Sequence, residues 1–155
     1  MTEHLRLLAK QLTHLQRMRN YLEYSSKRVQ QILPITNWQH LSLEQHETPA
    51  AFHVRFSEFQ EHLGNTMQAI AIEEEVETER FWAVLAFMEK IEIIETAGRW
   101  KLIRELRNAI NHEYEDNAER LAQFVLESLQ ATPELVEYFQ RSLTFCADAY
   151  GVKPE

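Results

Sequence analysis

The sequence predicts an all-α fold, an up-and-down bundle of about five helices. Only three glycines and four prolines occur in 155 residues, which is too few for the tight turns of a sandwich or barrel. Apolar residues recur at helical spacing over most of the chain. The length and the 45% hydrophobic content suit one domain over residues 1–150, followed by a tail over residues 151–155.

The first helix is predicted over residues 2–33, because this stretch holds neither glycine nor proline. Thr2 is suited to cap it, and Pro34 ends it. Apolar residues at helical intervals define its buried side: Leu5, Leu8, Leu12, Leu15, Leu22, Val29 and Leu33. The periodicity then fades, so residues 34–47 are predicted to form a connector.

Within the connector, Ser42 and Gln45 favour a short helical turn. Thr48 followed by Pro49 is a strong start signal, which predicts a second helix over residues 48–72. Its buried stripe is expected to contain Phe52, Phe56, Phe59, Leu63, Met67 and Ile70.

A third helix is predicted over residues 78–90, followed by a packed turn over residues 91–94. A fourth helix is predicted over residues 96–114, with its first residue as the cap. A fifth helix follows, in which Pro133 either kinks the helix or begins a new one that ends near residue 146.

The formal net charge of −8 means that bulk electrostatics do not attract nucleic acid, so any contact with RNA requires a local basic patch. The one cysteine, Cys146, is expected to be a structural thiol in a reducing compartment. The longest apolar run, Phe81–Met88, is too short to cross a bilayer, and the N-terminus lacks a signal-peptide core. We therefore expect a cytoplasmic protein with no membrane partner.

Several other features are expected to be structural. The seven histidines lack metal-ligand spacing and no Gly-rich phosphate loop occurs, so the sequence predicts neither a metal nor a cofactor. Trp38 and His40 in the connector are expected to be packing residues. The aromatic residues at helical spacing are expected to lie in the core and not to form a surface on which bases stack. They are Phe52, Phe56, Phe59, Phe81 and Trp82.

A local basic face lies on the predicted fourth helix, within WKLIRELRNAINHEY at residues 100–114. At about 100° per residue, one arc is apolar and is expected to face the core, with Leu102, Ile103, Leu106, Ala109 and Ile110. The opposite arc is polar and, apart from Glu105 near its edge, free of acidic residues: it holds Lys101, Arg104, Arg107, Asn108, Asn111, His112 and Tyr114. An RNA phosphate would need such a cationic strip.

Two interpretations of this face stay open on composition alone. A basic face near a helix C-terminus is favoured by the helix dipole, and His112 within the following acidic segment is compatible with a salt-bridged cap. The functional interpretation depends on the order of the residues. An arginine is followed directly by a polar residue, a histidine comes after four intervening residues counted from the arginine, and a tyrosine lies two positions after the histidine. Arg107, Asn108, His112 and Tyr114 satisfy each element of that order.

With this motif the chain resembles the HEPN superfamily, and within it the HepT-type toxins. A second shared stretch, RFSEFQEHLG at Arg55–Gly64, is similar to the family pattern R-F-x-x-L-Q-x-x-L-G. The segment ELRNAINHEYEDN resembles E-L-R-N-x-x-A-H-E-Y-P, with Asn111 where many relatives carry alanine. The resemblance covers roughly residues 48–143.

The resemblance implies a helical homodimer with metal-independent endoribonuclease activity, the toxin of a type VII-like toxin–antitoxin pair. RNA would be cut to leave a 2′,3′-cyclic phosphate. The partner would be a minimal nucleotidyltransferase antitoxin, which transfers AMP onto the motif tyrosine, here Tyr114, and so silences the toxin.

The chemistry suggests a role for each residue. His112 suits a base that takes the proton of a ribose 2′-hydroxyl, and Arg107 suits a fork that holds two phosphate oxygens. Asn108 would orient the imidazole or bond a phosphate oxygen. Contacts that steer RNA are expected from Lys101, Arg104 and Asn111.

Arg107 and His112 lie about 140° apart on one ideal helix, so two copies of the helix across a two-fold axis would be needed to bring them together. Tyr114 lies nearly over Arg107, two turns on, so an AMP group there would compete for the guanidinium. The alternative from another functional class is a non-catalytic HEPN adaptor that binds a nucleotidyltransferase and presents substrate or tyrosine to it.

Overall fold

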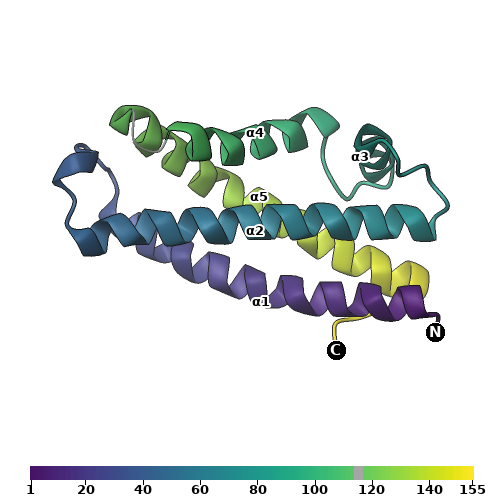
Figure 1. Ribbon diagram of the computed structural model, residues 1–155. Helices are drawn as coiled ribbons and strands as arrows, with labels where there is room; N and C mark the ends of the chain where they lie inside the picture. The colour runs from purple at the N-terminus through teal and green to yellow at the C-terminus, as the bar shows by residue number, and fades with distance from the viewer. Residues whose placement is uncertain (114–116) are drawn as a thin grey trace.

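The computed structural model describes residues 1–113 and 117–155, with the side chains of residues 110–113 also outside the description. Within these residues the chain forms five α-helices and no strand, which confirms the all-α class (Figure 1). They are α1 (Glu3–Ile32), α2 (Leu43–Glu73), α3 (Phe81–Lys90), α4 (Ala97–Glu113) and α5 (Ala118–Tyr150), with a short 3-10 helix, η1, at Trp38–His40.

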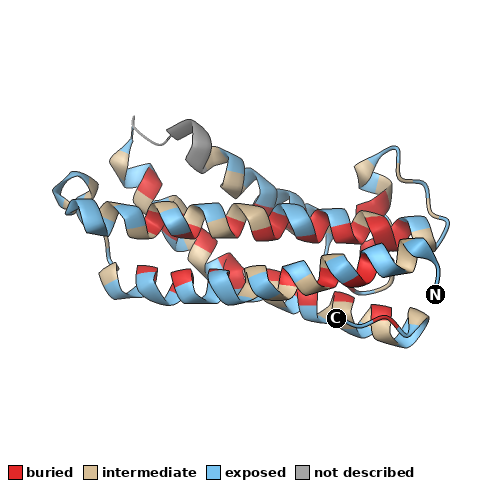
Figure 2. Ribbon diagram, turned by 60° about the horizontal axis from the view of Figure 1, so that its bottom comes forward, coloured by how far each residue is buried: buried red, intermediate tan, exposed pale blue. Residues whose placement is uncertain are grey.

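Helices α1 and α2 form a long antiparallel pair, and α5 packs across both of them (Figure 1). Helices α3 and α4 lie on the other side of α2, so α1 and α4 make no contact among the described residues. Buried residues line the sides of the helices that face one another (Figure 2). Aromatic side chains fill much of this core: Phe52, Phe56, Phe59, Trp100, Tyr138 and Phe139.

The predicted cap of the first helix is confirmed, because Thr2 Oγ1 accepts a hydrogen bond from Leu5 N. The predicted start of the second helix is wrong. Ser42 and Gln45 form a capping box, with Ser42 Oγ accepting from Gln45 N at 3.1 Å and Gln45 Oε1 accepting from Ser42 N at 2.9 Å. The helix therefore begins at Leu43, within the predicted connector, and Pro49 lies inside it. Two satisfied donors at the true start outweigh one bond lost at the proline.

The later boundaries lie close to the predicted ones. Thr96 caps α4, since its Oγ1 accepts from Arg99 N, and Ile93 and Ile94 are buried in the packed turn before it. The alternative at Pro133 is settled, because α5 runs through the proline as one helix to Tyr150.

Of two expectations about burial, one is confirmed and the other is wrong. Cys146 is buried, and burial raises the pKa of its thiol to about 12, which fits a structural residue. Trp82, expected in the core, is exposed, because α3 packs through Val84, Leu85 and Met88 instead. None of the helices in the described part of the chain combines the length and apolarity needed to span a membrane.

Leu12→Ala is expected to destabilise the protein by roughly 2–5 kcal/mol, because Leu12 is fully buried and its truncation leaves a cavity. Leu7→Ala removes the same atoms from an exposed position of the same helix and should change stability by less than about 0.5 kcal/mol. Urea unfolding followed by circular dichroism measures both. Equal effects of the two substitutions would contradict the described packing of α1.

Candidate functional site

Helix α4 carries the sequence-predicted site and is fixed at its N-terminal half. The Trp100 side chain is buried between α2 and α5, with its ring 6.5 Å from that of Tyr138, centroid to centroid. Beside it, Arg99 Nε donates to Glu134 Oε2 at 2.7 Å. These contacts set the rotation of α4 about its own axis.

That rotation differs from the predicted one. Over residues 97–109 of α4, Trp100 and Ile103 are buried, whereas Leu102, predicted to face the core, is 57% exposed. Leu106 and Ala109 are half-buried, and Ile110 lies outside the described side chains. The physical reason is that α4 lies at the edge of the bundle, so neighbouring helices cover only part of its apolar arc.

The same rotation places Arg107 differently from the expectation of a fully solvated polar face. Trp100, Ile103 and Arg107 follow one another at helical intervals of three and four residues, so they share one side of α4. Arg107 is accordingly half-buried rather than exposed.

Arg107 and Arg104 line a surface hollow of about 330 Å³ between α2, α3 and α4. Phe81 and Trp100 form its apolar wall. From α2 come the amide side chains of Gln60, Asn65 and Gln68, together with Glu61 and Gly64. The hollow thus combines two guanidinium groups with three amides, the donor set that suits a phosphate group.

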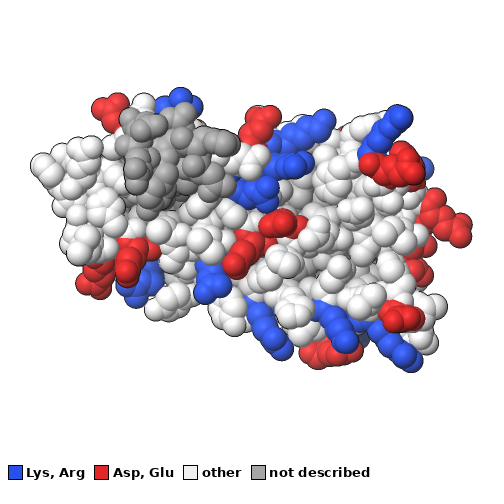
Figure 3. All heavy atoms as spheres, viewed as in Figure 1, with Lys and Arg blue, Asp and Glu red and all other residues white. Residues whose placement is uncertain are grey.

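The electrostatics of the hollow favour an anion. Neither Arg104 nor Arg107 forms an ion pair with any described residue, although Glu61 lies on the rim. Gln60 is only 2% exposed, and its Oε1 accepts no hydrogen bond from the described residues, so this oxygen calls for a donor and adds nothing to the attraction of an anion. Figure 3 shows Lys and Arg side chains gathered over the middle of α4, with acidic ones below them over α2. A bound phosphate would take up the unpaired positive charge.

Gly64 leaves room for no more than a small side chain beside the hollow. A Cβ atom there would lie 3.4 Å from Trp100 Cζ2 and 3.7 Å from Phe81 Cζ. A methyl group would therefore just fit, whereas a longer side chain would have to enter the hollow or displace the indole ring.

The other predicted site residues divide into two groups. Lys101 and Asn108 are exposed and do not line the hollow. Asn111 and His112 lie outside the described side chains, and Tyr114 lies outside the described residues. The alternative interpretation of His112 as a salt-bridged cap concerns the same side chain and so also lies outside the described residues.

A second groove, of about 470 Å³, separates α4 from α5. Its apolar floor contains Leu102, Leu106, Ala109 and Phe124, and charged side chains from both helices form its edges. Leu102, Leu106 and Ala109 follow one another at intervals of four and three residues, so they form a continuous apolar side of α4 that the single chain leaves partly uncovered.

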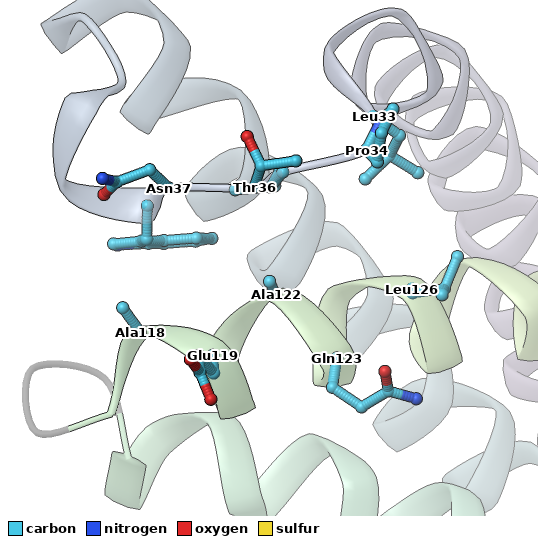
Figure 4. A pocket seen from close by; sticks show the side chains of 11 residues that line it. Leu33, Pro34, Thr36, Asn37, Ala118, Glu119, Ala122, Gln123 and Leu126 are labelled. Atoms are coloured by element: carbon cyan, nitrogen blue, oxygen red, sulfur yellow. The ribbon is translucent and has the colours of Figure 1, made fainter.

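A third hollow, of about 660 Å³, lies between the residues after α1 and the first turns of α5. Figure 4 shows Leu33 and Pro34 facing α5 across it, with Glu119 and Gln123 on the α5 side. Among the described residues that line it, Glu119 is the one with a charged side chain. Trp38, at its end, packs edge-on against His46 at 5.6 Å between ring centroids. A single carboxylate supplies no acid–base pair, so this hollow is a weaker catalytic candidate.

Sequence reasoning missed the α2 half of the site. Gln60, Gly64 and Gln68 follow one another at intervals of four residues and so share a face of α2. One signal was available, because Gln60 and Gly64 both lie inside the resemblance segment at Arg55–Gly64, next to the buried Phe59 and Leu63. A polar residue within an apolar stripe is unusual and indicates a site or a paired polar core.

No group of three or more His, Cys, Asp or Glu side chains within the described ranges is placed to hold a metal ion. Comparisons with protein-family models, with curated proteins and with solved structures give no match to this chain.

We expect pyrophosphate to stabilise the protein through Arg104 and Arg107. At ten times its dissociation constant it should raise the melting temperature by about 4 °C, because a ligand that binds only the folded state adds to its stability. Arg104→Gln/Arg107→Gln should abolish the increase in differential scanning fluorimetry. The control variant Lys27→Gln/Lys90→Gln, which removes two exposed cations elsewhere, should keep it; equal behaviour of the two variants would refute anion binding in the hollow.

Proposed function

We propose that this chain is a metal-independent endoribonuclease of the HEPN type, the toxin of a type VII-like toxin–antitoxin pair. One observation supports the proposal above the others: the two segments that carry the resemblance meet in space. Gln60 and Gly64, from Arg55–Gly64 on α2, line the same hollow as Arg104 and Arg107 on α4. Sequence similarity alone does not require two separate helices to share a cationic hollow.

In the proposed reaction the guanidinium of Arg107 holds two non-bridging oxygens of the scissile phosphate. His112 accepts the proton of the ribose 2′-hydroxyl while the 2′-oxygen bonds to phosphorus. The bond from phosphorus to the 5′-oxygen breaks, and that oxygen leaves with a proton from an imidazolium. The products are a 2′,3′-cyclic phosphate and a 5′-hydroxyl, and Asn108 orients the imidazole or contacts the phosphate.

A homodimer completes this site in the proposal. On an ideal helix positions 107 and 112 are about 140° apart, so in the proposal Arg107 and His112 serve one phosphate as residues of two subunits. The partly uncovered apolar side at Leu102, Leu106 and Ala109 supports an isologous contact along α4. Lys101 and Asn111 would then contact RNA beyond the reacting phosphate.

The proposed partner is a minimal nucleotidyltransferase that transfers AMP to Tyr114. Tyr114 follows Arg107 by seven residues, which on an ideal helix is two turns, so in the proposal the added phosphate would compete with RNA for the Arg107 guanidinium. The net charge of −8 supports the adaptor as a second candidate, because a free nuclease gains from a broader basic surface. Expression of the chain alone separates the two: growth arrest with RNA decay supports the nuclease, and harmless accumulation supports the adaptor.

His112→Ala and Arg107→Ala are each expected to reduce RNA cleavage by at least about 100-fold, because each removes a group that acts in the transition state. Cleavage of a labelled RNA in the presence of EDTA measures the loss, with size-exclusion chromatography confirming a folded dimer. The control variant Lys27→Gln/Lys90→Gln should cleave normally. Full activity of either site variant would refute the catalytic assignment.

Incubation with the nucleotidyltransferase of the same operon and ATP is expected to add AMP to the chain and to stop cleavage. Intact-mass spectrometry should show additions of one or more AMP groups that are absent in Tyr114→Phe. An unmodified wild-type chain, or an equally modified Tyr114→Phe variant, would contradict the proposed regulation.

A further inference from the structure

Positive charge is concentrated on α1, the helix farthest from the candidate site. Between Glu3 and Ile32 the sequence holds six Lys and Arg residues and two Glu residues. The rest of the chain holds 10 basic and 22 acidic residues. A cationic helix in an otherwise acidic protein requires an explanation beyond solubility.

Four of the six Lys and Arg residues of α1 lie in a narrow line together with one histidine and two tyrosines, and we call this line the α1 stripe. Its members are separated by three or four residues, all are exposed, and none is acidic: Arg6, Lys10, His14, Arg17, Tyr21, Tyr24 and Arg28. At about 100° per residue they fall within an arc of about 80°. Their span of 22 residue steps corresponds to about 33 Å along the helix, or about ten stacked nucleotides at 3.4 Å each.

The two tyrosines give the stripe planar apolar surfaces. Tyr21 is 49% exposed and Tyr24 is 63% exposed, which is high for large aromatic residues. A guanidinium lies over each ring: Arg55 Cζ is 4.8 Å from the Tyr21 centroid, and Arg28 Cζ is 5.9 Å from that of Tyr24. Exposed rings next to cations are the combination on which nucleobases stack.

Most of the charge on the stripe is unneutralised. Arg6, Lys10 and Arg17 form no ion pair with any residue that the structure describes. Among the described residues, Glu3 lies on the same side of α1 one turn before Arg6, and Glu58 pairs at 3.5 Å with the Arg55 guanidinium that lies over Tyr21. The backbone N of Glu155 donates to Thr13 Oγ1, and Glu44 and Glu47 line a hollow with Arg28 and Tyr24. Figure 3 shows a row of Lys and Arg side chains along its lower edge, over α1.

We propose that the α1 stripe binds single-stranded RNA, separately from the α4 hollow. Phosphates would contact the stripe cations, and bases would stack on Tyr21 and Tyr24. An anionic membrane is a poorer match, because α1 buries its apolar side against the bundle through residues such as Leu8, Leu12 and Leu15 and offers no face to insert. The inference rests on the proposed function only in the choice of RNA as the polyanion.

The test measures binding of a fluorescein-labelled 12-nucleotide RNA by anisotropy at several salt concentrations. The RNA carries 2′-O-methyl groups, so binding is measured without cleavage. Lys10→Gln/Arg17→Gln should weaken binding roughly 20-fold at 0.1 M salt and lower the slope of log affinity against log salt by about 1.4, because two phosphate contacts are lost. The matched control Lys27→Gln/Lys90→Gln removes two exposed charges outside the stripe and should bind as the wild type does.

A third variant, Tyr21→Ser, tests stacking. It should weaken binding of the single strand at least about fivefold while changing binding of a duplex of equal length less than twofold. Circular dichroism confirms that each variant is folded. The inference is overturned if the stripe and control variants bind alike, if Tyr21→Ser has no effect, or if the wild type binds vesicles of three parts phosphatidylcholine and one part phosphatidylserine but not RNA.

Failure of this inference is distinguishable from failure of the proposed function. Unchanged binding by Lys10→Gln/Arg17→Gln, together with loss of cleavage in His112→Ala, rejects the stripe and leaves the nuclease. Stripe-dependent binding by a chain that never cleaves unmodified RNA rejects the nuclease and leaves the stripe.

Discussion

Burial of the Trp100 ring against α2 and α5 sets the arrangement of the candidate site. The ring lies beside Gly64 of α2, where an added Cβ atom would be 3.4 Å from Trp100 Cζ2. Burial of this ring fixes the rotation of α4, and Arg107 follows it two turns later on the same side. An arginine that a solvated helix would present to water is thereby half-buried beside the amides of α2.

The same rotation has a second consequence on the opposite side of α4. Leu102 points outward, and Leu106 and Ala109 are only half-buried, so one chain does not cover the whole apolar surface of this helix. The cationic hollow and the uncovered apolar side therefore have one origin. A second copy packed on that side would lie against the helix that carries the proposed catalytic residues, which links assembly to activity.

Much of the fold could be predicted, because helix class, helix number and most boundaries depend on local spacing and caps. The error at the start of α2 came where two local signals competed, whereas Trp82 and Leu102 are exposed because of how their helices pack. At the start of α2, the capping box of Ser42 and Gln45 outweighed the Thr48–Pro49 signal, although both were visible in the sequence. At Pro133, burial of Leu135, Tyr138 and Phe139 keeps α5 continuous, and such packing is invisible to a local pattern.

By itself the sequence determined that the chain is helical, that α4 concentrates basic residues, and that Arg107, Asn108, His112 and Tyr114 stand in a motif-like order. The tertiary structure decided which of those residues share a site, namely Arg104 and Arg107 with Gln60 and Gly64 from a helix about forty residues earlier. The reason is geometric. Periodicity tells which side chains share a face of a helix, whereas the direction of that face depends on contacts between residues far apart in the chain.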